Sequence, residues 1–245
     1  MGKGEPLVLI HGFGSKKEMW KNQFELSESY RIIIPDLLGH GESNEVENIS
    51  IPNFAKNIMS LLDQLGIESA HFCGISLGGI ITQEIYRLFP KRVKSMILTN
   101  TTSYLPKTGA KWFLKKKIAK FISSPKEAIV LAAAKNCVYD QKPEIIQELK
   151  DALLLKDETY IKTAHETLGV NYLFMLPFIK VPTLIIGGLY DRLLPVILAR
   201  QTHLMTLGKA KLVIFDKCGH APVIEHKKRY NELLLEFLNN HKQIS

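Results

Sequence analysis

The sequence has few cysteines, no long apolar run and one long stretch without acidic residues. Its three cysteines, Cys73, Cys137 and Cys218, are odd in number and far apart, which argues against a disulfide framework or a zinc site. No apolar run approaches the roughly 20 residues of a membrane span. The N-terminal run LVLI is too short for a secretory signal. We therefore expect a cytoplasmic protein without stable membrane insertion, metal or cofactor.

The charge of the chain is unevenly distributed. The 245 residues, 46% hydrophobic and 23% charged, are typical of one large globular domain or two small ones. The net charge is +8, yet no acidic residue occurs between Glu84 and Glu127, where eleven lysines and arginines lie. The rest of the chain is therefore net −3 (8 − 11). Because the basic stretch carries no nucleic-acid recognition motif, we expect no nucleic-acid partner.

Short apolar runs alternate with helical stretches along most of the chain. The runs are rich in Ile, Val and Leu, which is typical of strands buried on both faces of a parallel sheet. Helices are predicted over 52–66, 77–89 and 227–240. The alternation predicts an α/β fold, with a mostly parallel sheet of about six strands and helices on both faces. The predicted strands are residues 6–11, 31–36, 70–76, 94–100, 182–188 and 210–216.

The alternation stops between residues 102 and 180, where the pattern is helical and no convincing strand occurs. The simplest interpretation is a helical lid, inserted between two adjacent strands above the C-terminal edge of the sheet. The predicted core then consists of residues 1–101 and 181–245, and the predicted lid of residues 102–180.

One serine, Ser76, lies among three glycines in the sequence GISLGG, between a predicted strand and a predicted helix. In this context G-x-S-x-G is typical of a sharp turn that raises a nucleophilic serine above the sheet. Gly74 and Gly78 are needed because side chains there would collide with the neighbouring strand and helix. Taken alone, the pentapeptide is equally compatible with a glycine-rich turn in which Ser76 only caps the helix.

A second glycine-rich loop, HGFG, follows the first predicted strand. In a serine hydrolase of this topology, this loop supplies one backbone N–H of an oxyanion hole, and the residue after the nucleophile supplies the other. Those residues are Phe13 and Leu77. His11 is interpreted as a residue that stabilises the loop, and the alternative for the motif is a glycine turn beside a core histidine.

Candidates for the general base and its acidic partner follow the last two predicted strands. His220 comes after the last strand, and Asp191 comes directly after the strand before it. An imidazole in such a loop can reach the serine oxygen, and a carboxylate on its far side orients it. The order Ser76, Asp191, His220 is the one expected for this architecture. The rivals are discounted because Asp216 ends its own strand and His226 begins the last helix.

Five motifs, HGFG, PDLLGHGES, GISLGG, YDRLLP and GHAPVIEH, lie in the order and at the spacing of the α/β-hydrolase superfamily. Over nearly its whole length the chain resembles the small lid-bearing carboxylesterases of that superfamily. The resemblance implies that Ser76 attacks an ester and that water activated by His220 releases the acid. It also implies that Asp36 and His40 brace turns. The chain lacks two strands that usually open the family's sheet, which predicts a sheet of about six strands, all parallel.

The segment AKWFLKKKIAKFI has an apolar face at helical spacing. That face is interpreted as the roof of an acyl pocket. Its lysines either serve solubility or attract an acidic partner, such as an acyl carrier protein or an anionic surface. Ordinary packing is an equal alternative for the residues proposed to bind substrate. Those candidates are Tyr104, Leu105, Trp112, Met175, Phe178 and Leu194.

The leading hypothesis is a serine carboxylesterase that hydrolyses a small-molecule ester with a short to medium acyl chain. A serine at position 76 argues against the relatives that use a carboxylate nucleophile. The basic lid and the GHAPVIEH motif also resemble the pimeloyl-carrier-protein methyl ester esterases of biotin synthesis. Enol-lactonases, carbon–carbon bond hydrolases and perhydrolases use the same three residues, so these remain open. The alternative outside the enzymes is a binding protein, a ligand receptor of this fold with little turnover.

Overall fold

Six apolar runs form the strands of one sheet in the computed structural model. The structure describes residues 1–44, 47–107 and 110–241, apart from the side chains of residues 110–113, 117, 120 and 157. The sheet order is β2-β1-β3-β4-β5-β6, and every neighbouring pair is parallel. The prediction of about six parallel strands is confirmed. The strands are β1 (Pro6–Ile10), β2 (Arg31–Ile33), β3 (Ala70–Ile75), β4 (Val93–Thr99), β5 (Thr183–Gly188) and β6 (Ala210–Phe215).

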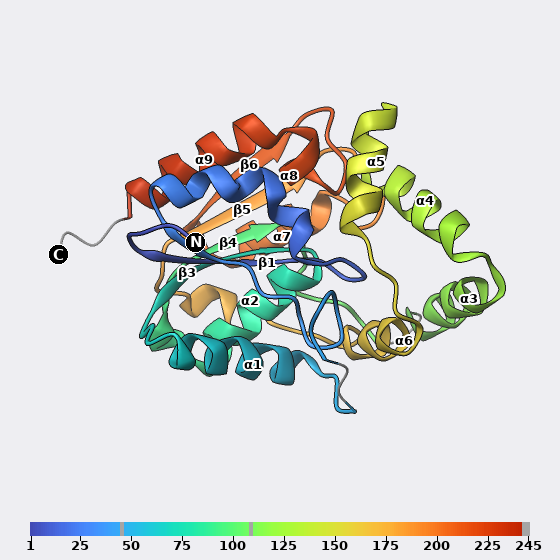
Figure 1. Cartoon of the computed structure of the whole chain (residues 1–245). Helices are drawn as coiled ribbons and strands as arrows, with labels where there is room; N and C mark the ends of the chain where they lie inside the picture. Colours follow the sequence, from blue (N-terminus) through green and yellow to red (C-terminus); the bar gives the residue numbers. More distant parts are fainter. Residues whose placement is uncertain (45–46, 108–109, 242–245) are drawn as a thin grey trace.

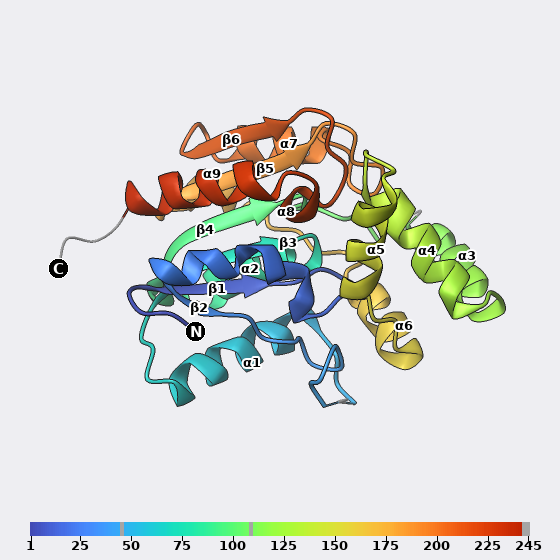
Figure 2. The same cartoon turned by 45° about the horizontal axis from the view of Figure 1, so that its top comes forward.

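Helices cover both faces of the sheet, as Figures 1 and 2 show. Alternate strand residues point to opposite faces, so Phe72 and Met96 pack under one layer while Cys73 and Ile97 pack under the other. The Phe72 layer consists of α1 (Ile51–Gln64) and α2 (Leu77–Leu88), with α7 (Ile197–Met205) beside them. The opposite layer consists of the 3-10 helix η1 (Lys17–Glu28), α8 (Pro222–Glu225) and α9 (Lys227–Asn239).

Helix α1 begins and ends as its sequence predicts. The Ser50 hydroxyl accepts a hydrogen bond from the backbone N–H of Asn53 at 3.3 Å, and Pro52 lies in the first turn. Gly66 follows the helix with a φ of 66°, a conformation that glycine adopts without steric cost. At the free edge of β2, the backbone of Met1 pairs with Ile32 through hydrogen bonds of 2.8 and 3.0 Å, so this edge is partly covered.

The segment between β4 and β5 is helical. Figures 1 and 2 show its four helices grouped beyond the end toward which the parallel strands run. Its described residues contribute no strand to the sheet, only isolated bridges such as Tyr104 with Asn171. Whether the segment acts as a lid stays a prediction. The helices are α3 (Ala110–Ser123), α4 (Lys126–Cys137), α5 (Pro143–Ala152) and α6 (Asp157–Glu166). The 3-10 helix η3 (Leu176–Phe178) follows them and precedes β5.

No helix in the described part of the chain is both long enough and apolar enough to cross a bilayer.

Candidate active site

Ser76 lies in a sharp turn between β3 and α2. Its backbone has φ 55° and ψ −117°, a combination that costs a non-glycine residue free energy and persists only where surrounding contacts enforce it. Two such contacts are present: the Ser76 N–H donates to the Thr99 carbonyl at 3.0 Å, and the Thr101 hydroxyl donates to the Ser76 carbonyl at 2.6 Å. The turn therefore depends on residues at the end of β4.

The glycines beside Ser76 allow backbone segments to approach closely. A methyl group on Gly74 would collide with the carbonyl of Gly78, and one on Gly78 would collide with the carbonyl of Ile10 on β1. The prediction that side chains here would meet a neighbouring strand and helix is confirmed.

The PDLLGHGES loop has a structural role, because Asp36 accepts hydrogen bonds from the backbone N–H of Lys17 at 2.7 Å and of Glu42 at 3.0 Å.

Asp191 and His220 are joined by a hydrogen bond. The distance from His220 Nδ1 to Asp191 Oδ2 is 2.6 Å, and both side chains are buried. Burial acts to raise the pKa of Asp191. The hydrogen bond and charge of His220, with the backbone N–H of Leu194 at 3.0 Å, outweigh burial and hold that pKa below its usual range. An ionised Asp191 stabilises the Nδ1–H tautomer of His220 and leaves Nε2 available as a base.

The rival candidates, Asp216 for the acid and His226 for the base, are not part of this hydrogen-bonded pair. Asp216 is exposed, and the Nε2 atom of His226 lies 3.2 Å from the carbonyl of Lys217. Among the described residues, the Ser76 hydroxyl has no hydrogen bond. The catalytic roles of Ser76, Asp191 and His220 therefore stay predictions, although all three follow the ends of strands at one edge of the sheet.

Asn100 is a further residue of this site that the sequence patterns did not indicate. Its side-chain amide donates to Asp191 Oδ2 at 2.8 Å and to the carbonyl of Gly219 at 3.0 Å. Asn100 therefore links the loop that carries Asp191 to the loop that carries His220. The residue is buried, and its φ is 41°. One available signal was the run NTTS directly after a buried strand, because asparagine tolerates this left-handed region better than most residues.

Glu225 connects the loop of His220 to the helical segment between β4 and β5. One carboxylate oxygen accepts from the Gly219 N–H at 2.7 Å, and the other accepts from the N–H groups of Tyr139 at 2.6 Å and Asp140 at 3.1 Å. Burial raises the pKa of Glu225, although these three donors oppose the effect. In addition, the backbone N–H of His220 donates to the carbonyl of Cys137 at 2.6 Å. The position of His220 thus depends on α4 and the turn after it.

The two proposed oxyanion donors belong to segments next to Ser76. Leu77 begins α2, and the backbone of Gly12, next to Phe13, lies so close to Ser76 that a methyl group on Gly12 would be 3.3 Å from the Ser76 Cβ. No described residue accepts a hydrogen bond from the backbone N–H of Phe13 or Leu77. Free donors at this position are compatible with the predicted oxyanion hole, which stays a prediction.

His11 supports the loop before Phe13. Its Nε2 atom accepts from the backbone N–H of Leu37 at 3.0 Å, so its Nδ1–H donates to the carbonyl of Gly12 at 2.8 Å. Burial is the main cause that lowers the pKa of His11 to about 3, with the nearby His40 acting in the same direction. His11 is therefore neutral at pH 7 and has a structural role.

The lowered pKa of His11 predicts a loss of stability in mild acid. Below pH 6.5 the unfolded chain protonates this histidine while the folded chain does not, so the free energy of unfolding falls as pH decreases from 6.5 toward about 3. The expected loss from His11 is roughly 2 kcal/mol between pH 7 and pH 5. Urea unfolding at several pH values measures it. A His11→Gln variant, although less stable at pH 7, should show a shallower decline, and parallel curves for the two proteins would contradict the prediction.

The predicted substrate-binding residues are dispersed. Leu194 donates its N–H to Asp191, whereas Tyr104 and Leu105 pair with the backbone of residues 169–171. Met175 packs in the apolar layer that includes α1 and α2. The side chain of Trp112 lies outside the described residues.

Phe178 requires a correction. Its side chain is 74% exposed, and the neighbouring Pro177 accepts a hydrogen bond from the ammonium group of Lys209, just before β6 begins. Phe178 therefore lies toward the N-terminal ends of the strands, whereas Ser76 lies at their C-terminal ends. Phe178 is close in sequence to Asp191, but β5 lies between them in the chain and places them at its opposite ends.

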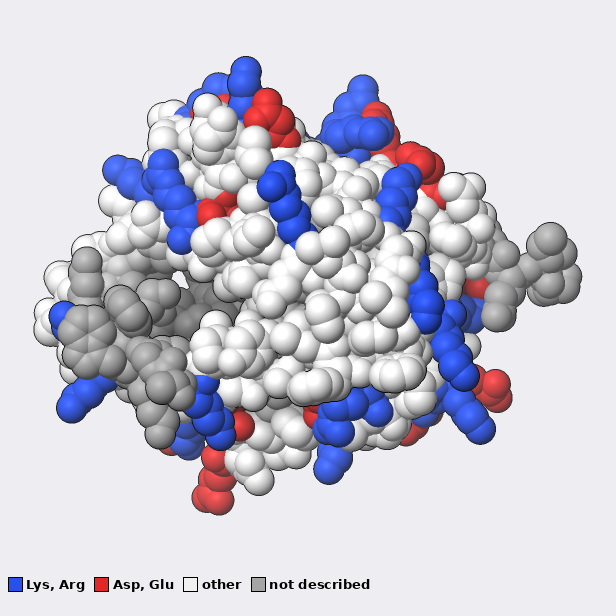
Figure 3. Space-filling model, turned by 180° about the vertical axis from the view of Figure 1, so that it is seen from behind, with Lys and Arg blue, Asp and Glu red and all other residues white. Residues whose placement is uncertain are grey.

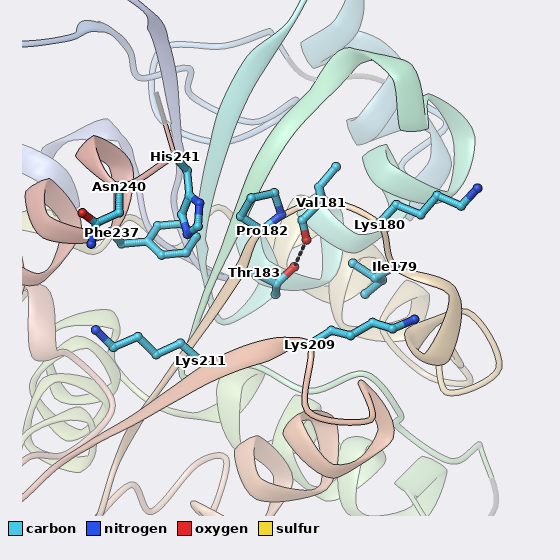
Figure 4. Close-up of a pocket in the computed structure, with 10 residues that line it drawn as sticks. All are labelled: Ile179, Lys180, Val181, Pro182, Thr183, Lys209, Lys211, Phe237, Asn240 and His241. Atoms are coloured by element: carbon cyan, nitrogen blue, oxygen red, sulfur yellow. Dashed lines mark hydrogen bonds between the residues drawn. The ribbon is translucent and has the colours of Figure 1, made fainter. Parts of the chain in front are cut away.

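A pocket of about 570 Å³ also lies at the N-terminal ends of β5 and β6, away from Ser76 (Figure 4). Three lysines line it, but Figure 4 shows the side chain of Lys211 extending to one side of the pocket and those of Lys180 and Lys209 to the other. Lys211 pairs with Glu236 at 2.8 Å, and Lys209 donates to Pro177 at 2.7 Å. This pocket therefore has no convergent charge with which to bind an anion.

Comparison with known proteins identifies the family. A family model for the alpha/beta hydrolase fold matches residues 5–124. A provisionally named carbamate hydrolase, RutD, from Pseudomonas savastanoi pv. phaseolicola is 30% identical over 248 residues, which cover 95% of this chain and 93% of that protein. The chain belongs to the alpha/beta hydrolase family.

Other proteins similar to this alpha/beta hydrolase have names that refer to different substrates. A 2-hydroxy-6-oxononadienedioate/2-hydroxy-6-oxononatrienedioate hydrolase from Paraburkholderia phymatum is 29% identical over 263 residues, covering 96% of this chain and 87% of that protein. A thermophilic esterase from Thermogutta terrifontis has the same fold, with a TM-score of 0.90, 24% identity and coverage of 99% and 92% of the two chains. Hydrolysis is the activity that these names share.

Proposed function

We propose that this alpha/beta hydrolase is a serine carboxylesterase that cleaves short- to medium-chain acyl esters through an acyl-enzyme on Ser76. The observation that carries the proposal is the strained turn at Ser76. Beside it lie backbone N–H groups that no described residue pairs, and a buried Asp191–His220 pair lies at the same edge of the sheet. Strain of this kind is maintained at functional sites, where it positions a reacting group.

The side chains above the HGFG loop support an uncharged acyl group as the substrate. The ring of Phe13 lies 4.3 Å from that of Tyr160 on α6, and Tyr160 stacks on Phe121 of α3 at 4.1 Å. A methyl group added to Gly14 would lie 2.6 Å from the side chain of Leu155 and 3.6 Å from that of Tyr160. An acyl chain that leaves Ser76 in this direction would meet an apolar, aromatic wall, which stabilises hydrocarbon and gives no compensation to a buried charge.

The proposed reaction has two steps. His220 Nε2 takes the hydroxyl proton of Ser76 as its oxygen attacks the ester carbonyl, and the N–H groups of Phe13 and Leu77 stabilise the oxyanion. Collapse of this intermediate breaks the bond to the alcohol, which leaves with the proton from His220. Water then attacks the acyl-enzyme with His220 again as base, and the acid is released while Ser76 regains its proton. Asp191 stays ionised throughout and stabilises the imidazolium.

The names of the relatives support a second candidate, hydrolysis of a carbon–carbon bond, since the Paraburkholderia phymatum protein is named for a dienedioate substrate. A more specific form of the leading proposal is an ester carried on an acidic carrier protein that meets α3, where Lys115 and Lys116 are exposed. An enzyme of that kind should prefer a carrier-bound methyl ester over the free ester, and neutralising Lys115 should reduce the preference.

A substrate comparison tests the proposal. The wild-type protein is assayed with p-nitrophenyl acetate, butyrate and octanoate, with a 2-hydroxy-6-oxo dienoate and with a simple carbamate. We expect kcat/KM for the best ester to exceed the values for the other two classes by at least about 100-fold, equivalent to about 2.7 kcal/mol of transition-state stabilisation. Turnover of the dienoate in preference to every ester would favour the second candidate, and turnover of none would refute both.

A further inference from the structure

Large apolar side chains are exposed on two neighbouring turns, away from Ser76. Phe174 and Phe178, which precede β5, are 82% and 74% exposed, and Leu204 and Leu207, at the end of α7, are 71% and 70% exposed. Isolated exposed apolar residues are ordinary, but several large ones on one surface indicate contact with another apolar phase.

The two turns form one surface. Helix η3 packs against α7, and the ammonium group of Lys209 donates to the carbonyl of Pro177 at 2.7 Å, which joins the second turn to the first. Beneath them, Met205 and Met175 pack in the same apolar layer. We call the surface made by Phe174, Phe178, Leu204, Leu207, Arg200 and Lys209 the α7 face.

The charge of the α7 face has one sign. From residue 167 to residue 215 the only acidic residue is Asp191, which is buried beside His220, whereas Lys180, Arg200 and Lys209 occur in the same interval. Arg200 is exposed on α7 between Ile197 and Leu204, three and four residues away, so it lies on their side of the helix. Helix α7 lies behind the sheet in Figure 1, and Figure 3 shows the centre of that rear face as largely uncharged, with basic and some acidic side chains around it.

We propose that the α7 face docks on a bilayer that contains anionic phospholipid. Apolar side chains that protrude from turns can enter the boundary between headgroups and acyl chains, while Arg200 and Lys209 meet lipid phosphates. A second copy of the chain fits less well, because a two-fold contact would place the same basic residues opposite one another. The attachment is peripheral and does not require the proposed esterase activity.

Co-sedimentation with vesicles tests the docking. The full chain is mixed with vesicles of phosphatidylcholine alone, or of phosphatidylcholine with an equal amount of phosphatidylglycerol. We expect binding to the anionic vesicles only, weakened by high salt. The double variant Phe174→Ser/Phe178→Ser should lower the partition coefficient at least about tenfold, because partial burial of two aromatic rings contributes more than 1.4 kcal/mol. Arg200→Glu should lower it about fivefold or more.

Matched variants separate this face from others. Ile122→Ser removes an apolar side chain that is 68% exposed on α3, and it should bind vesicles like the wild type. Ser76→Ala should also bind normally, so a failure of the esterase proposal would leave this result unaffected. Equal binding to both vesicle types, no binding, or an equal loss for Ile122→Ser would overturn the proposal. Light scattering that detects a dimer, lost in the Phe174→Ser/Phe178→Ser variant, would assign the face to a second copy instead.

Discussion

Replacement of His220 by alanine is expected to lower kcat for p-nitrophenyl butyrate by about 10⁴-fold or more, because no other group would take the proton from Ser76. KM should change little, since His220 acts on the reacting atoms and does not hold the acyl chain. Ser76→Ala should produce a loss of similar size, and the double variant should be no worse than either single variant, because the two residues act as one unit. Steady-state kinetics with active-site titration measures these effects.

His226→Ala is the matched control. It removes an imidazole only six residues away, which lies near the carbonyl of Lys217 and has no contact with Asp191 among the described residues. This variant should retain the wild-type kcat. A large loss in His226→Ala with activity retained in His220→Ala would reassign the general base, and activity retained in Ser76→Ala would exclude Ser76 as the nucleophile.

The strands and the turn at Ser76 were predictable because their causes are local in sequence. A strand buried on both faces needs a continuous apolar run, and β1 and β5 have one. The turn needs glycine at Gly74 and Gly78 because backbone carbonyls approach those positions, and the spacing of the motif records that requirement directly.

The residues that support the site were not predictable because their partners are distant in sequence. Asn100 and Asp191 are separated by 91 positions, and Glu225 and Tyr139 by 86. No periodicity or motif indicates such a pair, since the contact exists only once β4, β5 and the helical segment are placed together. Phe178 shows the converse error, in which nearness along the chain was taken for nearness in space. Its position is set by η3, which lies at the other end of β5.

Asn100→Asp is expected to lower kcat at pH 7 by roughly 10²-fold, about 2.7 kcal/mol of barrier, without a comparable change in KM. The substitution keeps the shape of the side chain but replaces the amide that donates to Asp191 with a second carboxylate, 2.8 Å from the first. Two carboxylates at this distance cannot both ionise at their usual pKa, so the pair holds a proton to higher pH. While it does so, the pair carries the same single negative charge as Asp191 alone, but that charge is shared with residue 100, so less of it lies beside the His220 imidazolium.

The pH dependence distinguishes this electrostatic effect from a loss of structure. The activity of Asn100→Asp should recover as pH rises and the shared proton is released, so the acid limb of its kcat profile should move to higher pH. Asn100→Gly is the control: it also removes the donor, adds no charge, and places at φ 41° a residue that accepts this conformation without strain. Its kcat should fall less, with an unshifted acid limb. If both variants lose the same activity at every pH, Asn100 contributes packing alone, and its link between Asp191 and Gly219 has no effect on the charge at His220.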